Sequence, residues 1–294
     1  MASRFRSEPT SEHAAVETVS DDELGSIPGY RAVIRIAIRE YRIAIRGRWA
    51  IGLTALFAIF SVTVVGFGTS EVGPSQYAAV VASLVELGVY LVPLAALTVG
   101  YDTVVGAREA GSLDMLFTLP VSQAQVIFGK YLGRLAVLGG AMGIGLGVGG
   151  VAATLIGGIG GLEQYALFVI VSVATAGVFL GVSVLLSTLA REKTQALGAA
   201  LVAWLWFVLL HDLVAIGLIA GTELPDAALT VMALTNPADV YRLLVLSQLE
   251  TTTGGFAAVL AKASLSVPLL VVALIVWLLA PIVVATVGIR HQPP

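Results

Sequence analysis

Long apolar runs separated by short polar segments dominate this chain of 294 residues. Six runs approach or exceed the roughly 20 residues that a helix needs to cross the hydrocarbon core of a bilayer. The first run is too long for a cleavable signal and no small-residue cleavage site follows it, so we expect it to stay in the protein. The pattern predicts an all-α, polytopic membrane protein with six transmembrane helices, at about 49–67, 80–105, 132–159, 165–189, 196–220 and 265–289.

A different periodicity precedes the first run, over residues 29–48. At about 100° per residue, five arginines project from one narrow side of a helix, while isoleucines and valines cover much of the rest. We therefore predict an amphipathic helix along the cytoplasmic leaflet, with its arginines toward headgroups or water. It either anchors the first span or regulates the protein. A nucleic-acid-binding arm is not expected, because the apolar face would lack a partner. The five are Arg31, Arg35, Arg39, Arg42 and Arg46.

Composition and charge agree with a membrane protein and set its orientation. Hydrophobic residues make up 57% and charged residues 12% of the chain, against about 25% charged in soluble domains. Residues 1–27 are acidic and without apolar periodicity, so we predict a disordered cytoplasmic tail followed by one membrane domain over 28–290. Fourteen of the sixteen Lys and Arg residues fall in the N-terminal segment, the 106–134 loop, the 190–195 loop or the C-terminus. By the positive-inside rule, both termini are cytoplasmic.

The absence of cysteine narrows the chemistry. With no Cys in the sequence, disulfides and cysteine-based metal or redox sites are excluded. We also expect no metal and no cofactor in this chain.

Residues 101–133 form a polar, glycine-punctuated segment between two apolar runs. Its charges and unpaired backbone groups would each cost several kcal/mol in hydrocarbon, so it lies at the membrane edge. We predict an amphipathic helix within 107–119, ended by Pro120, with Ser122 as the N-cap of the next helix. The segment is either an ordinary cytoplasmic loop or a coupling helix that fits a groove on a cytoplasmic motor.

The same segment carries a family resemblance. Its pattern resembles the signature of ABC-type-2 transporter permeases, and the topology and the N-terminal amphipathic helix extend the likeness to about residues 28–290. Gln123 departs from it, since the family usually has Arg there. The resemblance implies that Arg108, Glu109, Gly111, Ser112 and Leu113 contact an ATPase. The motif residues are Arg108-Glu109-x-Gly111-Ser112-Leu113, Leu119-Pro120-Val121-Ser122 and Gly129-Lys130-x-x-Gly133.

The resemblance implies a permease subunit in the cytoplasmic membrane that moves cargo with a separate ATPase chain. Gly129-Lys130 is followed by Tyr131 rather than Ser or Thr, so no phosphate-binding loop of the Walker type is present. ATP and Mg²⁺ would belong to the ATPase, and this chain would not itself be an enzyme. Further expected partners are a second copy in a homodimer and the lipid bilayer, but not nucleic acid.

A second string lies in the segment 222–262, which we expect outside the cytoplasm. Asn236 is suited to cap a helix, Pro237 to begin it and Asp239 to its first turn. The string Asn236-Pro237-Ala238-Asp239-Val240-Tyr241-Arg242 resembles permeases of the transporter that matures the copper-sulfur centre of nitrous-oxide reductase. It implies an extracytoplasmic partner, contacted by Asn236, Pro237, Asp239 and Arg242.

Three ionisable residues interrupt the apolar spans, namely Glu86, His211 and Asp212. Such residues are functional candidates by default. They either line an outward cavity, form one hydrogen-bonded cluster, or serve structure alone. Copper(I) would favour Cys or Met ligands, and the internal methionines are scattered, so no dedicated copper path is visible. The cargo of such a system could be a sulfur species or a mechanical signal.

Glycines spaced by four residues mark two spans and permit close helix packing, either within one subunit or at a dimer seam. They are Gly139, Gly143 and Gly147, then Gly145 and Gly149, in the third span, and Gly177 and Gly181 in the fourth.

Other functions remain open on sequence alone. A general ABC exporter of drugs, lipids or polysaccharides is one alternative. An ion-driven carrier would require inverted repeats, which are not evident. An intramembrane enzyme would require a catalytic constellation, for which only His211 and Asp212 offer themselves.

Overall fold

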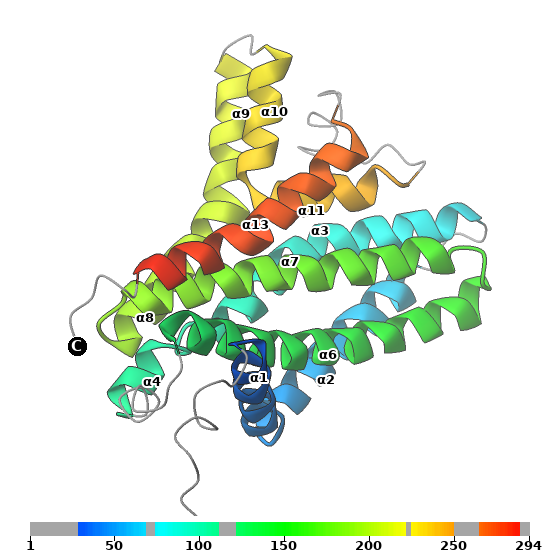
Figure 1. The fold of residues 1–294 in the computed structure, drawn as a ribbon. Coiled ribbons are helices and arrows are strands. Elements are labelled where there is room, and N and C mark those ends of the chain that lie inside the picture. The colour runs from blue at the N-terminus through cyan, green and yellow to red at the C-terminus, as the bar shows by residue number, and fades with distance from the viewer. Residues whose placement is uncertain (1–28, 69–73, 112–121, 222–224, 250–264, 289–294) are drawn as a thin grey trace, which may run out of the picture.

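The computed structural model describes residues 29–68, 74–111, 122–221, 225–249 and 265–288, and every regular element in these ranges is helical (Figure 1). Six helical segments in them are long and apolar enough to cross a membrane: Arg48–Phe67, Tyr77–Glu109, Gln123–Gly157, Leu162–Leu189, Lys193–Gly221 and Val267–Gly288. This confirms the prediction of an all-α, polytopic protein with six spans. The expected tail, residues 1–27, lies outside the described residues.

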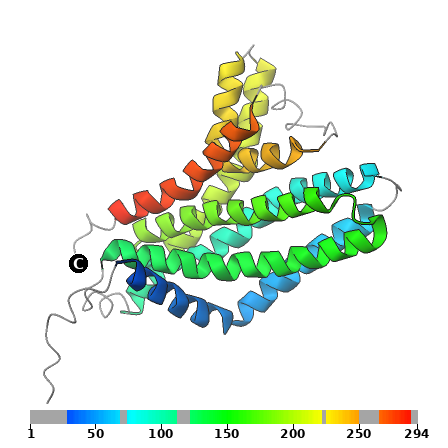
Figure 2. The ribbon, with the colours of Figure 1, turned by 45° about the vertical axis from the view of Figure 1, so that its right-hand side comes forward.

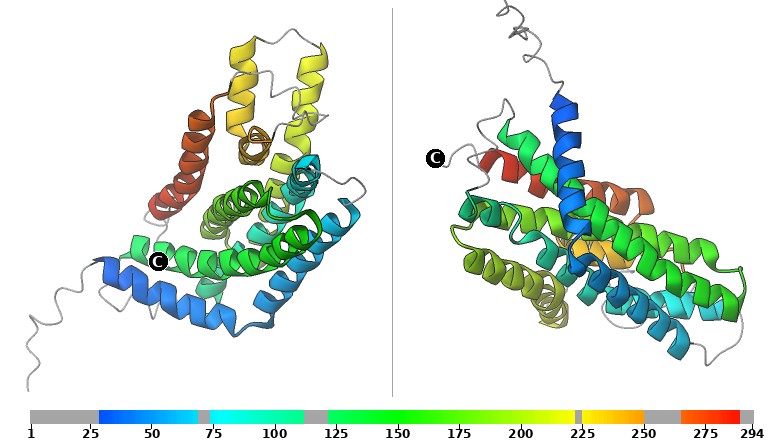
Figure 3. Two further views of the ribbon diagram at one scale, coloured as in Figure 1. Left: turned by 90° about the vertical axis from the view of Figure 1, so that its right-hand side faces the viewer. Right: turned by 90° about the horizontal axis from the view of Figure 1, so that it is seen from below.

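The first two helices lie against one long helix. α1 (Gly29–Ile45) and α2 (Arg48–Phe67) both pack on α6 (Gln123–Gly157), and α1 crosses the bundle when it is seen from below (Figure 3). A Cβ on Gly129 would lie 2.6 Å from Cβ of Ile36, and one on Gly133 would lie 2.7 Å from the Ala37 carbonyl oxygen. The two glycines of the Gly-Lys-x-x-Gly motif thus allow α1 to pack closely against α6.

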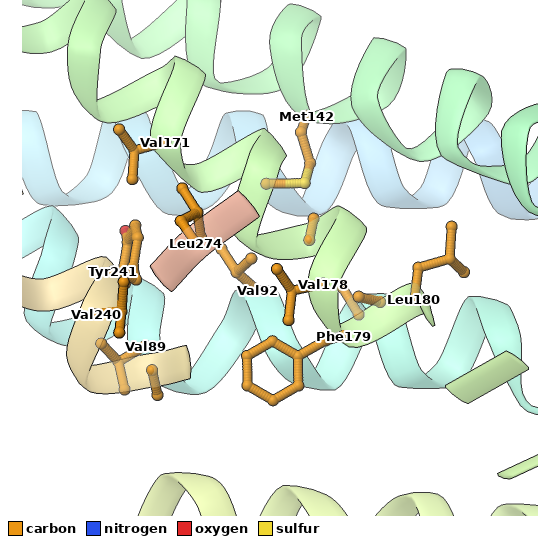
Figure 4. Close-up of a cluster of buried hydrophobic side chains, with 14 of the residues drawn as sticks. Val89, Val92, Met142, Val171, Val178, Phe179, Leu180, Val240, Tyr241 and Leu274 are labelled. Carbon is orange, nitrogen blue, oxygen red and sulfur yellow. The ribbon is translucent and has the colours of Figure 1, made fainter. Parts of the chain in front are cut away.

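α7 (Leu162–Leu189) is the central helix. It packs against α3 (Pro74–Gly100), α6 and α13 (Val267–Gly288). Phe179 and Leu180 of α7 are fully buried, and they lie near Val92 of α3 and Met142 of α6 in the apolar cluster of Figure 4. This burial holds the long helices in a fixed arrangement.

The glycines spaced by four residues have different surroundings in α7 and α6. In α7, a Cβ on Gly177 would meet Leu278 at 2.9 Å and one on Gly181 would meet Ile282 at 3.3 Å, so both pack on α13 within this chain. In α6, Gly145 lies against α2, whereas a Cβ on Gly143 would meet no described residue within 4 Å. The α7 pair therefore serves packing within one subunit.

The C-terminal half departs from parallel packing. α8 (Lys193–Leu205) runs through one π-helical turn, η2 (Trp206–Leu210), into α9 (His211–Gly221). α9 and α10 (Asp226–Thr235) project away from the bundle (Figures 1 and 2). α11 (Pro237–Leu246) then turns back against α3, α7 and α13, and all ten of its residues are buried.

Candidate functional site

A short helix, α4 (Val105–Glu109), lies at the end of the bundle that also holds the start of α6 and the end of α13 (Figure 1). Its entry is fixed to α7, because the backbone amides of Val104 and Val105 donate to Oγ of Ser187 at 3.0 and 3.1 Å. The start of the polar segment 101–133 is therefore hydrogen-bonded to the central helix α7.

Two consecutive side chains of α4 meet two helix ends. Nη1 of Arg108 donates to the Ala190 carbonyl oxygen at 3.0 Å, just past the last turn of α7. Oε1 of Glu109 accepts from the backbone amide of Lys193 at 2.9 Å, and its Oε2 lies 3.4 Å from Nζ of Lys193. A cation at a helix C-terminus and an anion at a helix N-terminus both complement the helix dipole. Arg108 and Glu109 thus join α4, which directly follows α3, to the α7–α8 connection.

The helix predicted within 107–119 overlaps α4 at residues 107–109, and residues 112–119 of that prediction lie outside the described residues. Gly111 has φ +64°, a left-handed conformation that breaks the helix and favours glycine. Ser112 and Leu113 lie outside the described residues. The cap on α6 is confirmed: Oγ of Ser122 accepts from the amide of Gln125, and the Gln125 side chain accepts from the Ser122 amide at 2.9 Å.

A second polar group lies at the same end and was not foreseen. Arg134 of α6 donates to Asp102 and to the Val99 carbonyl, and its Nε lies 3.2 Å from Oε1 of Glu40. Nζ of Lys130 lies 3.6 Å from the other oxygen of Glu40. These ion pairs hold α1, α3 and α6 together. The charges on residues 102 and 130 were visible in the sequence, but their partners were not.

A third polar group, the Arg242 cluster, is centred on this arginine of α11. Its Nη1 lies 3.2 Å from Oδ1 of Asp239 and 3.2 Å from Oδ2 of Asp212 on α9. Its Nε lies 3.3 Å from Oε2 of Glu86 on α3. Arg242 is 4% exposed, so a charge that would be costly in isolation is balanced by carboxylates from three helices.

His211 extends this cluster to the π-helical turn. Its Nδ1 lies 3.2 Å from Oδ2 of Asp239 and 3.0 Å from Nδ2 of Asn236. The same Asn236 amide donates to the carbonyl of Phe207, which belongs to η2, at 2.9 Å. Asn236 also caps α11 as predicted, since its Oδ1 accepts from the Ala238 amide at 3.0 Å. A π-helical turn is rare and is frequently found at functional sites.

The structure therefore brings Glu86, His211 and Asp212 into one cluster, which was one of the three options. Asn236, Pro237, Asp239 and Arg242 are all buried, so their side chains face the protein interior rather than an outer partner. Sequence reasoning placed these two groups in separate sites. The pattern of α11, with polar residues at every third position, was the available signal of a helix with a polar side.

The chemistry of this cluster favours charge pairing over catalysis. Ligand atoms of His211, Asp212 and Asp239 lie within 4.8 Å of one another, close enough to share a cation. Arg242 already supplies a positive charge to both carboxylates. We assign no metal to the cluster. None of its described residues is a Ser, Thr or Cys that would serve as a nucleophile beside the histidine.

Comparison with known proteins covers most of the chain. The family model described as "ABC-2 family transporter protein" matches residues 34–288. The chain is 35% identical over 274 residues to a "Probable ABC transporter permease protein NosY" of Pseudomonas aeruginosa, covering 88% of this chain and 98% of that protein. It is 34% identical over 257 residues to the protein of the same description from Stutzerimonas stutzeri, covering 84% and 91%.

Proposed function

Because this chain belongs to the ABC-2 family of transporter proteins and is the membrane permease subunit of an ABC transporter, we propose that its ATPase acts on α4 and the α7–α8 connection. One observation carries this proposal: Arg108 and Glu109 bind both helix ends of that connection. A force on α4 therefore bears on α3, α7 and α8 together.

Two of the helices that meet at α4, namely α3 and α8 with its continuation α9, also meet at the Arg242 cluster. α3 carries Glu86, and α8 continues through η2 into His211 and Asp212. Arg242 binds to both helices at that level. Rigid helices with polar contacts at each end can pass a displacement from one end to the other. We propose that ATP-driven movement at α4 changes the pairing around Arg242.

The protein is a multi-pass plasma-membrane protein. We propose that its termini and α4 face the cytoplasm. Fourteen of the sixteen Lys and Arg residues support this orientation. We also propose a homodimer of permease chains and an extracytoplasmic partner. Since the Asn-Pro-Ala-Asp-Val-Tyr-Arg string is buried, that partner would contact other outer residues.

We propose further that the transporter serves maturation of nitrous-oxide reductase. The string at 236–242 and the two relatives described as NosY support this assignment. Deletion of the gene should leave the reductase polypeptide present but without the absorbance of its copper-sulfur centre. Normal assembly of that centre in the deletion strain would favour a general exporter instead.

Docking of the ATPase is tested by two glycines that both have a positive φ. Gly111 and Gly158 have φ +64° and +79°, and neither would place a Cβ within 4 Å of another group in the described part of the chain. Valine at either position strains the backbone. Gly111→Val should reduce co-purification of the ATPase, whereas Gly158→Val, at the opposite end of the bundle, should not. Equal retention by both variants would place the ATPase contact elsewhere.

A further inference from the structure

A cavity of about 620 Å³ lies between α2 and α3 and is covered at one end by α1 and α6. This volume falls within the range of about 300–1,000 Å³ typical of small-molecule sites. Its inner walls are apolar, from Leu53 and Leu56 of α2 and Leu91 and Leu94 of α3. Its opposite end is polar, at the ion pairs of Arg134.

The cavity has the length and polarity of one lipid leaflet. From Leu91 to Val99, α3 rises about 12 Å at 1.5 Å per residue. Half of a hydrocarbon core is about 15 Å. The polar end lies at the level of Asp102, Arg134 and α4, the side of the membrane to which the charge pattern assigns the cytoplasm. The cavity therefore accommodates an acyl chain that enters from the cytoplasmic leaflet.

A basic groove adjoins the cavity on α1. Arg35, Arg39, Arg42 and Arg46 line it and are exposed, and Ile43 lines both the groove and the cavity. Within residues 29–68, 74–111, 122–221, 225–249 and 265–288, no carboxylate forms an ion pair with these four arginines. The planar guanidinium group of arginine can donate two hydrogen bonds to the oxygens of one phosphate.

We propose that an anionic phospholipid of the cytoplasmic leaflet binds here, with its phosphate on the arginines of α1 and one acyl chain in the cavity behind Ile43. The lipid would occupy the space between α2 and α3 and hold α1 against the membrane. Because α1 also contacts α6 through Glu40, Lys130 and Arg134, the occupied site would stabilise the cytoplasmic end of the bundle.

The cavity is tested by filling it from Gly52. Gly52 lines the cavity, and a Cβ on it would meet none of the described residues within 4 Å, so Gly52→Leu places a side chain where the acyl chain would lie. Gly66→Leu is the matched control, because Gly66 lies on the same helix outside the cavity, and a Cβ there would also meet nothing within 4 Å among the described residues. The full-length chain is purified in detergent with dioleoylphosphatidylglycerol or dioleoylphosphatidylcholine, and retained lipid is counted by native mass spectrometry.

We expect the wild type and Gly66→Leu to retain phosphatidylglycerol over phosphatidylcholine, and Gly52→Leu to bind it about tenfold more weakly, a loss of about 1.4 kcal/mol. Thermal unfolding without added lipid checks that all three chains fold. Undiminished lipid binding by a folded Gly52→Leu chain would overturn the proposal.

The headgroup site is tested separately. Arg39→Gln with Arg46→Gln should remove the preference for phosphatidylglycerol, whereas Arg191→Gln, an exposed arginine between α7 and α8, should keep it. The acidic residues 1–25 are the competing occupant of the basic groove. If the wild type retains no phosphatidylglycerol and a chain lacking residues 1–25 retains it, the tail rather than a lipid occupies the groove, and the proposal fails.

Discussion

The carboxylate of Glu86 lies 3.3 Å from Nε of Arg242, which links the second membrane span to the buried helix α11. Asp212 and Asp239 share the other end of the same guanidinium. Three carboxylates from three helices therefore meet at one guanidinium. Loss of the cation would leave charges of one sign close together in an interior of low dielectric constant.

Arg242→Met should accordingly destabilise the protein strongly, by about 3–5 kcal/mol, because it leaves buried carboxylates without a counter-ion. Glu86→Gln should cost much less, since the Glu86 side chain is 42% exposed. Melting temperatures of the purified chains in detergent provide the measurement. Adding Asp239→Asn to Arg242→Met should recover part of the loss. Similar melting temperatures for Arg242→Met and wild type would mean that the cluster contributes little to the fold.

The glycines of α6 give a second matched comparison. A Cβ on Gly145 would lie 2.7 Å from both Cβ of Phe57 and the Thr54 carbonyl oxygen, whereas one on Gly143 would meet no described residue within 4 Å. Gly145→Ala should therefore force α2 away and cost about 1–3 kcal/mol. Gly143→Ala should be neutral or raise stability by up to about 1 kcal/mol, as alanine favours a helix. A lower melting temperature for Gly143→Ala than for Gly145→Ala would contradict this packing.

The spans and the caps were predictable because they depend on local sequence. Apolar runs of sufficient length identify membrane helices, and Ser122 and Asn236 stand directly before helical patterns. The arrangement of Glu86, His211 and Asp212 in one cluster was among the options considered. Sequence alone could not select it, because their common partner, Arg242, comes from a helix distant in the chain.

The burial of α11 was missed for a physical reason. The sequence of α11 resembles that of an exposed helix, because Asn236, Asp239 and Arg242 lie in one short segment. Each of these polar groups is matched by a group on α3, α9 or η2, so burial of α11 is compensated. The ATPase contact of Glu109 stays a prediction, to which the structure adds that the Glu109 carboxylate accepts from the Lys193 amide at the start of α8.

The proposed orientation can be tested in this cysteine-free chain. Arg191 lies between α7 and α8, and Glu163 lies in the first turn of α7 at the opposite end, and both are exposed. A membrane-impermeant maleimide added to intact cells should label Glu163→Cys but not Arg191→Cys, and both should react after the membrane is opened. Labelling of Arg191→Cys alone in intact cells would reverse the orientation.

The isolated chain should not bind ATP. Its Gly129-Lys130 pair lies inside α6, beside α1, where Gly129 contacts Ile36 rather than forming a loop around a phosphate. Titration of the purified chain with a fluorescent ATP analogue should show no saturable binding. Hydrolysis by a preparation free of other subunits would contradict the assignment of ATP to a separate chain.

Two substitutions separate the hydrogen bond that Glu109 accepts from the negative charge that it carries. Glu109→Gln keeps an oxygen that can accept from the Lys193 amide, while Glu109→Lys removes the acceptor and places two cations together. An exposed ion pair contributes about 1 kcal/mol or less, so Glu109→Gln should leave the α4–α8 contact largely intact. Glu109→Lys should release α4 and reduce both ATPase association and its stimulation by the permease.

Glu109→Gln then distinguishes two ways in which this residue could couple the subunits. If Glu109 acts by holding α4 on α8, the glutamine variant should retain nearly normal ATPase stimulation, because the hydrogen bond to α8 remains. If its charge pairs with the ATPase, glutamine should weaken association as lysine does. We expect the first result, since Lys193 already pairs with both carboxylate oxygens. Normal association and stimulation in Glu109→Lys would show that the α4–α8 contact is not used in coupling.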